Sequence, residues 1–213
     1  MNGVVVNIRG MNASGKSTMV REFCRKYSLQ PQEVIFKGKK FKTMFDGKRL
    51  VMGWYQPFST GEGCDALKAD KEEFREFLRY SMDQIKPTVI VYEKQIWSNT
   101  YKFTGEISEM CDQHGYGFIA IQMLVRYETA LNRLLVRNGG RTDKLRQFDK
   151  NFRAVRSSAI NLKKAKKIVF DIDSEEIPIE NTWRCIDEAI MLFYNGERGG
   201  KLSGLYVDSM KMH

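Results

Sequence analysis

One short segment combines the residue types needed to hold a phosphate chain. Residues 10–17 fit the pattern G-x-x-x-x-G-K-S. Its glycines let backbone N–H groups curve around a phosphate, its lysine neutralises phosphate charge, and its serine hydroxyl is a ligand for Mg²⁺. We therefore expect a nucleoside triphosphate, taken to be ATP with Mg²⁺, to bind these residues: Gly10, Met11, Asn12, Ala13, Ser14, Gly15, Lys16 and Ser17.

Arginines further along the chain indicate which class of phosphate-binding protein this is. The sequence lacks the N-K-x-D motif of GTPases, and its third predicted strand ends in Glu93, where motor and switch proteins need Asp. A planar guanidinium can hold phosphate oxygens during phosphoryl transfer. We expect a helical lid over residues 126–165 in which Arg133, Arg137 and Arg141 bind the nucleotide and Arg137 also assists catalysis. A solvated cationic helix face is the alternative interpretation.

Lysines interleaved with aromatic residues suggest where the phosphoryl acceptor binds. They fall within residues 38–66, between two predicted strands. Cations suit the phosphates of a nucleic acid, and aromatic rings suit an unstacked base. The predicted acceptor-binding residues are Lys39, Lys40, Lys42, Trp54 and Tyr55. The alternative is that these lysines only make a hairpin soluble.

Two carboxylates follow these lysines at positions suited to a reaction at a hydroxyl group. A kinase needs a carboxylate that orients the acceptor oxygen and takes its proton. Asp65 ends a glycine-rich stretch, and we assign it as the base. Glu93 ends a predicted strand, where sheets of this type bind ligands, and we assign it to Mg²⁺, through water, or to the acceptor. With Lys16, Asp65 and Glu93 complete the predicted catalytic set, and Ser17 and Glu93 form the metal site.

The elements that must position these groups follow from hydrophobic spacing. Short β-branched runs alternate with amphipathic helical patterns, which predicts a five-stranded parallel sheet flanked by helices. We expect a single α/β domain over residues 1–213, interrupted by a basic β-hairpin that turns at Asp46-Gly47. Asp70 and Glu73 form a predicted capping box for a following helix. The predicted strands cover residues 4–8, 33–36, 88–93, 118–124 and 167–171.

Composition limits the partners and the compartment. The chain of 213 residues has a formal net charge of +9, and its first fifty residues carry 11 basic and 3 acidic side chains. Residues 126–167 carry 13 basic and 3 acidic side chains, so the excess charge is local and suits a polyanionic partner. Four scattered cysteines and two histidines support neither a zinc site nor a disulfide framework. Without an apolar span or a leader pattern, we expect a cytoplasmic protein that does not enter a membrane.

Several of these segments together resemble one family, the bacteriophage P-loop kinases of thymidine hypermodification, also called 5-hydroxymethyluracil DNA kinases. The resemblance lies in residues 9–18, 52–55, 61–67, the strand ending in Glu93 and residues 137–140. It implies a small nucleotide-kinase-like fold, ATP and Mg²⁺ as cofactors, Thr18 as part of the nucleotide site, and phosphorylation of hydroxymethylated pyrimidines in DNA in the host cytoplasm. The chain departs from the family in having Ser59-Thr60-Gly61-Glu62-Gly63 in place of a tighter glycine pair before Cys64.

Two further functions remain open on the sequence. A nucleoside monophosphate or small-metabolite kinase of the same fold would need the lid arginines but no extended basic surface. A non-enzymatic, ATP-gated nucleic-acid-binding subunit would need neither Asp65 nor Glu93 for its activity.

Overall fold

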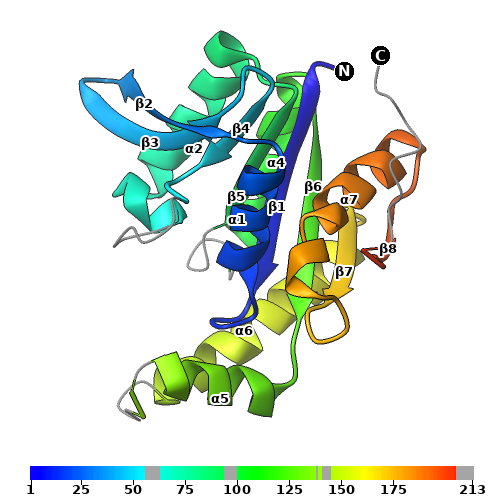
Figure 1. The fold of residues 1–213 in the computed structure, drawn as a ribbon. Coiled ribbons are helices and arrows are strands. Elements are labelled where there is room, and N and C mark those ends of the chain that lie inside the picture. The colour runs from blue at the N-terminus through cyan, green and yellow to red at the C-terminus, as the bar shows by residue number, and fades with distance from the viewer. Residues whose placement is uncertain (56–62, 94–99, 138, 141–144, 205–213) are drawn as a thin grey trace.

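A computed structural model describes residues 1–55, 63–93, 100–137, 139–140 and 145–204, which form one eight-stranded sheet flanked by helices (Figure 1). The strand order is β2-β3-β4-β5-β1-β6-β7-β8. The strands are β1 (Gly3–Gly10), β2 (Gln30–Phe36), β3 (Lys39–Phe45), β4 (Arg49–Met52), β5 (Val89–Glu93), β6 (Tyr116–Leu124), β7 (Val169–Asp173) and β8 (Gly199–Lys201). The α-helices are α1 (Lys16–Lys26), α2 (Lys71–Tyr80), α4 (Tyr101–Gln113), α5 (Tyr127–Arg137), α6 (Leu145–Lys164) and α7 (Arg184–Tyr194).

The central strand β1 is buried along its whole length because helices cover both faces of the sheet. Val4, Val6 and Ile8 pack in a core with residues of α1 and α7, whereas Val5 faces the core formed with α2 and α4. Successive side chains of a strand point to opposite faces, so a run of β-branched residues fills both cores. The result is a mixed α/β fold in three layers.

The parallel pairing of β5, β1 and β6 brings three chain segments to one edge of the sheet. Ile8 lies opposite Glu93 in the register of β1 with β5, and Gly10 lies opposite Met123 in the register of β1 with β6. The turn between β1 and α1 therefore begins beside Glu93 and Met123. Parallel pairing continues outward through β4 on one side and through β7 and β8 on the other.

The predicted count of five strands is wrong, because the sheet has eight, and the predicted hairpin insertion is present as strands β3 and β4 of that same sheet. The tight turn at Gly47 is confirmed, with φ of 92°, but β4 then enters the main sheet beside β5. A second tight turn, at Lys37 and Gly38, has φ of 49° and 74° and pairs β2 with β3 in antiparallel fashion. Positive φ at both central residues suits a two-residue hairpin turn. Strand β8 is short and begins with two glycines, so its sequence carries no strand pattern.

The helices near the predicted site begin and end close to the expected positions. The capping box of α2 is present, with Asp70 accepting hydrogen bonds from the backbone N–H groups of Glu72 and Glu73. Helices α5 and α6 occupy the predicted lid region and share a small core with Met11 of the β1–α1 turn. None of the helices in the described ranges has the length and apolar character needed to cross a lipid bilayer.

Candidate functional site

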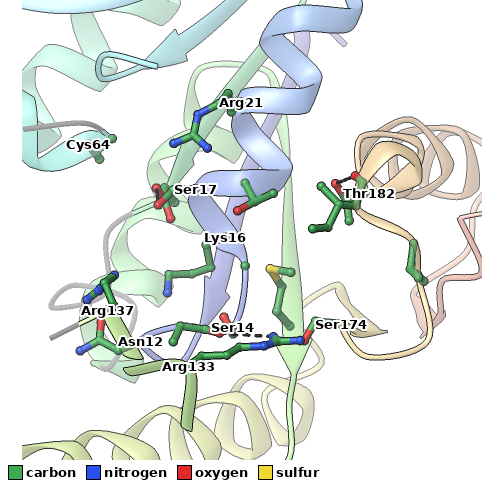
Figure 2. A pocket seen from close by; sticks show the side chains of 18 residues that line it. Asn12, Ser14, Lys16, Ser17, Arg21, Cys64, Arg133, Arg137, Ser174 and Thr182 are labelled. Carbon is green, nitrogen blue, oxygen red and sulfur yellow. Dashed lines mark hydrogen bonds between the residues drawn. The ribbon is translucent and has the colours of Figure 1, made fainter. Parts of the chain in front are cut away.

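A cleft of about 670 Å³ opens at the carboxyl edge of the central strands (Figure 2). Its walls come from the β1–α1 turn, the end of β5, helix α5 and the chain between β7 and α7. Figure 2 shows Lys16 in the middle of this cleft, with Arg133 and Arg137 reaching in from α5 and Thr182 on the opposite side. Cationic and hydroxyl groups from separate parts of the chain thus converge in one space.

The turn between β1 and α1 has the strand–loop–helix context that a P-loop requires. Gly15 caps α1 with φ of 95°, a left-handed conformation that favours glycine. A Cβ on Gly10 would lie 2.6 Å from the Ser14 hydroxyl and 3.0 Å from the Met123 side chain, so the turn tolerates no side chain there. Ser14 is buried, and its hydroxyl has no hydrogen-bond partner in the described part of the chain. The first turn of α1 also directs its backbone N–H groups toward the cleft, which suits an anion.

Lys16 and Ser17 carry the polar groups of this turn. The Lys16 ammonium donates a hydrogen bond to the Met11 carbonyl over 2.6 Å, and the lysine is 8% exposed at the cleft wall. The Ser17 hydroxyl donates to Glu93 Oε1 over 2.5 Å. A hydroxyl and a carboxylate held together in this way form the kind of oxygen pair that Mg²⁺ prefers. The predicted metal pair, Ser17 and Glu93, therefore lies together in space.

Glu93 receives a second hydrogen bond from a residue with a different predicted role. The Tyr55 hydroxyl donates to the same Oε1 atom over 3.2 Å, and Tyr55 is only 2% exposed. Burial, and then the nearby Glu93 carboxylate, raise the pKa of Tyr55 well above its ordinary value, so the phenol stays protonated. The prediction that Tyr55 offers a stacking surface for a base is wrong, because its ring packs in the core beside α1. Tyr55 instead positions Glu93.

A narrow backbone contact holds Tyr55 in this place. Trp54 and Gly63 exchange two backbone hydrogen bonds of 3.2 and 2.8 Å. Gly53 has φ of 117°, and a Cβ there would lie 2.4 Å from the carbonyl oxygen of Gly63. Gly63 and Cys64 then line the cleft next to Glu93. The two backbone segments can approach this closely only because neither Gly53 nor Gly63 has a side chain.

The lid arginines lie at the cleft as predicted, whereas two other predicted residues fall outside the description. Arg133 donates a long hydrogen bond of 3.4 Å to the Ala13 carbonyl of the P-loop turn, and Arg137 lines the same wall. Arg141 lies outside the described residues. Asp65 belongs to a short 3-10 helix, Cys64–Leu67, but its side chain is not among those described. The assignment of Asp65 as the base stays a prediction.

Arg9 is a buried cation directly before the P-loop turn, and sequence reasoning gave it no role. It is completely buried and donates hydrogen bonds of 2.7 Å to Thr104 of α4 and to Ser158 of α6. Burial lowers the pKa of Arg9 to about 10, partly offset by Tyr92, so the guanidinium stays charged at neutral pH. Arg9 thus ties α6 to the strand that carries the P-loop. A charged residue in an otherwise apolar strand was the available signal.

Glu175 fixes the start of α5. It accepts hydrogen bonds from the backbone N–H and the guanidinium of Arg126 and from the Thr129 hydroxyl. The Thr129 and Arg126 hydrogen bonds lower the pKa of Glu175 to about 2, with Arg126 having the larger effect. The negative charge also favours the positive end of the α5 dipole. Its neighbour Ser174 lines the cleft, so this contact holds the start of α5 at the cleft edge.

The basic hairpin does not reach the cleft wall. Lys39 pairs with Glu73 of α2, and Lys40 pairs with Glu33 over 2.9 Å. The Lys42 ammonium lies 5.0 Å from the ring centroid of Trp54, so it covers the half-buried indole. The structure brings none of these three lysines to the P-loop, because strands β4 and β5 lie between β3, which carries them, and β1. Trp54 connects to the cleft through its pairing with Gly63.

Arg21 is a cleft residue that sequence reasoning missed. It lies one helical turn after Ser17 on α1 and lines the cleft near Cys64. The i, i+4 spacing was a usable signal, because residues four apart share a helix face. The 179–182 segment between β7 and α7 also lines the cleft, and its sequence carries no signal of that role.

No family model matches this chain, and no curated protein matches it. Across the described residues, no group of three or more His, Cys, Asp or Glu side chains is arranged to hold a metal ion. A site with few protein ligands is still compatible with Mg²⁺, which keeps several waters and shares substrate phosphates.

Proposed function

We propose that this protein is an ATP- and Mg²⁺-dependent phosphotransferase of the P-loop kinase class. The observation that carries this proposal is the convergence of Lys16, the Ser17–Glu93 pair and the two α5 arginines in one cleft. The order of the inner strands supports it, since β1 with its P-loop lies between β5 and β6. Ligands of open parallel sheets bind where neighbouring connections diverge to opposite sides, as they do at this strand.

Each group in the cleft has a role that its chemistry supports. MgATP supplies the phosphoryl group when bound. The P-loop backbone and Lys16 would hold the phosphates, and Ser17 with Glu93 would hold the metal. Arg133 and Arg137 would stabilise the negative charge that develops during transfer. Tyr55 would keep Glu93 oriented throughout, because its hydroxyl donates to that carboxylate.

The proposed acceptor is the hydroxymethyl group of 5-hydroxymethyluracil in DNA. This part rests on the family resemblance and on the excess of positive charge. Its hydroxyl oxygen would bond to the γ-phosphorus as the bond to the ADP oxygen breaks, and its proton would pass to a carboxylate, for which Asp65 is our assignment. The base must leave the stack to reach a cleft of this size.

A small acceptor is the second candidate, and one observation favours it. Two of the three lysines that were expected to meet a polymer, Lys39 and Lys40, are paired with acidic residues away from the cleft. A nucleoside monophosphate or small metabolite would need only the cleft itself.

An acceptor screen with labelled ATP tests the proposal. We expect label to enter DNA that contains 5-hydroxymethyluracil, and to stay out of unmodified DNA and of free nucleoside monophosphates. Lys16→Ala should abolish transfer. Label in the free monophosphates alone would show that the protein is a nucleoside monophosphate kinase, the second candidate. An absence of transfer to every acceptor, in a folded protein with Mg²⁺, would refute the kinase proposal.

A further inference from the structure

Helix α6 presents a cationic face to solvent along its length. Its buried side carries Phe148, Val155, Ala159 and Leu162; Phe148 and Val155 pack against α5, and Leu162 belongs to the core under the sheet. The opposite side follows the same helical repeat of three to four residues and is exposed. The cations on this exposed side, which we call the α6 face, are Lys150, Arg153, Arg156, Lys163 and Lys164.

Most of the charges of the α6 face have no ion-pair partner within the described part of the chain. Asp149 is the acidic residue within α6, and it accepts a hydrogen bond from Tyr127. Of the five cations, Lys163 alone forms an ion pair among the described residues, with Asp171 over 2.5 Å. The other four are exposed and form no ion pair among the described residues.

Three lysines of the hairpin formed by β2 and β3, which turns at Lys37 and Gly38, are ion-paired, unlike most cations of the α6 face. Lys37 pairs with Glu76 over 2.7 Å, and the neighbouring Lys39 and Lys40 pair with Glu73 and Glu33. Exposed ion pairs stabilise a fold little, but each places a negative charge beside a lysine and so weakens the local positive potential that a polyanion experiences. The first fifty residues carry 11 basic and 3 acidic side chains, and the fold reduces this excess by bringing Glu76 and Glu73 of α2 beside Lys37 and Lys39.

The α6 face also has the length and position that a nucleic acid requires. Twenty residues of helix span about 30 Å, close to the ~34 Å of one turn of B-form DNA. The helix begins beside α5, whose arginines line the cleft, and Ser158 anchors it to Arg9 before the P-loop (Figure 1). At its other end, Lys166 and Lys167 line two further grooves together with Arg198. Cations thus extend from α5 at the carboxyl edge of the strands to the opposite edge, where Met1 and Tyr116 line one of these grooves.

We propose that the α6 face, continued by Lys166 and Lys167, binds the sugar–phosphate backbone of DNA, and that the β2–β3 hairpin does not. Contacts with phosphates position a protein on DNA without reading bases. A duplex on α6 would pass the lid, where a single base has access to the cleft. A bilayer is the weaker match, since the apolar side of α6 is buried and, among the side chains of this helix that the structure describes, Ile160 is the one large apolar residue that is exposed.

This inference draws its choice of DNA from the proposed function, so its test measures binding without catalysis. The test variant is Lys150→Gln, Arg153→Gln and Arg156→Gln combined, in the full chain. The control variant loses the same number of positive charges from the hairpin and carries Lys39→Gln, Lys40→Gln and Lys42→Gln. Fluorescence anisotropy with an unmodified 25-base-pair duplex, at several NaCl concentrations and without ATP, gives Kd and its salt dependence. Circular dichroism and the melting temperature confirm that both variants fold.

We expect the α6 variant to bind at least tenfold more weakly at 0.1 M NaCl and to lose about 2.7 from the slope of log K against log salt, because each phosphate contact contributes about 0.9. The hairpin variant should stay within about twofold of wild type. Equal or greater loss in the hairpin variant, or no binding by the wild type at low salt, would overturn the proposal. So would loss of binding to anionic lipid vesicles in the α6 variant with DNA binding intact.

The same variants separate this inference from the proposed function. Lys16→Ala should bind the duplex as the wild type does. If the α6 variant loses DNA binding and no acceptor is ever phosphorylated, the DNA surface stands and the kinase proposal fails. If modified DNA is phosphorylated and the α6 variant keeps its affinity, the kinase proposal stands and this surface is wrong.

Discussion

Tyr55 offers the sharpest test of how the cleft is held together. Replacing it with phenylalanine removes one hydroxyl and leaves the buried ring in place. The lost hydrogen bond is the one to Glu93 Oε1, which also accepts from Ser17. Glu93 would keep its place in the sheet and its hydrogen bond from Ser17, but its carboxylate would have one donor fewer and would be oriented less firmly. We expect Tyr55→Phe to affect both stability and turnover.

The magnitude follows from the geometry. A hydrogen bond to a charged group contributes about 1.5 to 3 kcal/mol, and the length of 3.2 Å places this one at the weak end. A loss of about 1.5 kcal/mol lowers the melting temperature of a protein of this size by about 3 to 6 °C. If the same loss of about 1.5 kcal/mol raises the activation free energy of phosphoryl transfer, kcat falls about tenfold. The KM for ATP should stay within about twofold, because the P-loop itself is unchanged.

A matched variant separates positioning from simple stability. Tyr27 also donates to a carboxylate, Asp187 Oδ2, over 2.6 Å, but this pair joins α1 to α7 outside the cleft. Tyr27→Phe should lower the melting temperature at least as much, because its hydrogen bond is shorter, and should leave kcat unchanged. Thermal denaturation and steady-state ATP turnover measure both effects. If Tyr55→Phe behaves like Tyr27→Phe, with stability lost and turnover intact, the positioning role of Tyr55 is refuted.

Three further changes test the surrounding structure by thermal or urea denaturation. Glu175→Gln should lower the free energy of unfolding at neutral pH. Because Arg126 holds the pKa of Glu175 low in the folded state, the difference in unfolding free energy between the variant and wild type should shrink as pH falls from 4.5 toward about 2. A difference that stays constant with pH would contradict this. Gly53→Ala should lower the free energy of unfolding by about 3 kcal/mol, since its Cβ would lie 2.4 Å from the Gly63 oxygen. An unchanged unfolding free energy would show that the backbone at Gly53 and Gly63 does not approach so closely. Asp70→Ala should cost about 1 kcal/mol through loss of the capping box, whereas an unchanged midpoint would show that the box does not contribute.

Local patterns predicted the parts of this protein that depend on neighbouring residues. The P-loop turn, the Asp46-Gly47 turn and the capping box at Asp70 each depend on a few consecutive residues, and the structure has a turn or a cap at each position. The apolar runs of β1, β5 and β6 predicted central strands, because only a strand covered on both faces needs such composition. Arg133 reaches the cleft because parallel pairing sends β6 and its following helix to the P-loop edge.

Pairing between distant segments was beyond those patterns. The sequence showed a lysine-rich hairpin, but its neutralisation by Glu73 and Glu76 depends on where α2 packs. Tyr55 looked like an aromatic residue of a loop, yet the contact between Trp54 and Gly63 turns it into the core. The amino-acid sequence by itself determined which groups carry charge and which turns can form. Only the tertiary structure decided which charges stay exposed and which hydroxyl holds Glu93, because both depend on contacts between residues far apart in the chain.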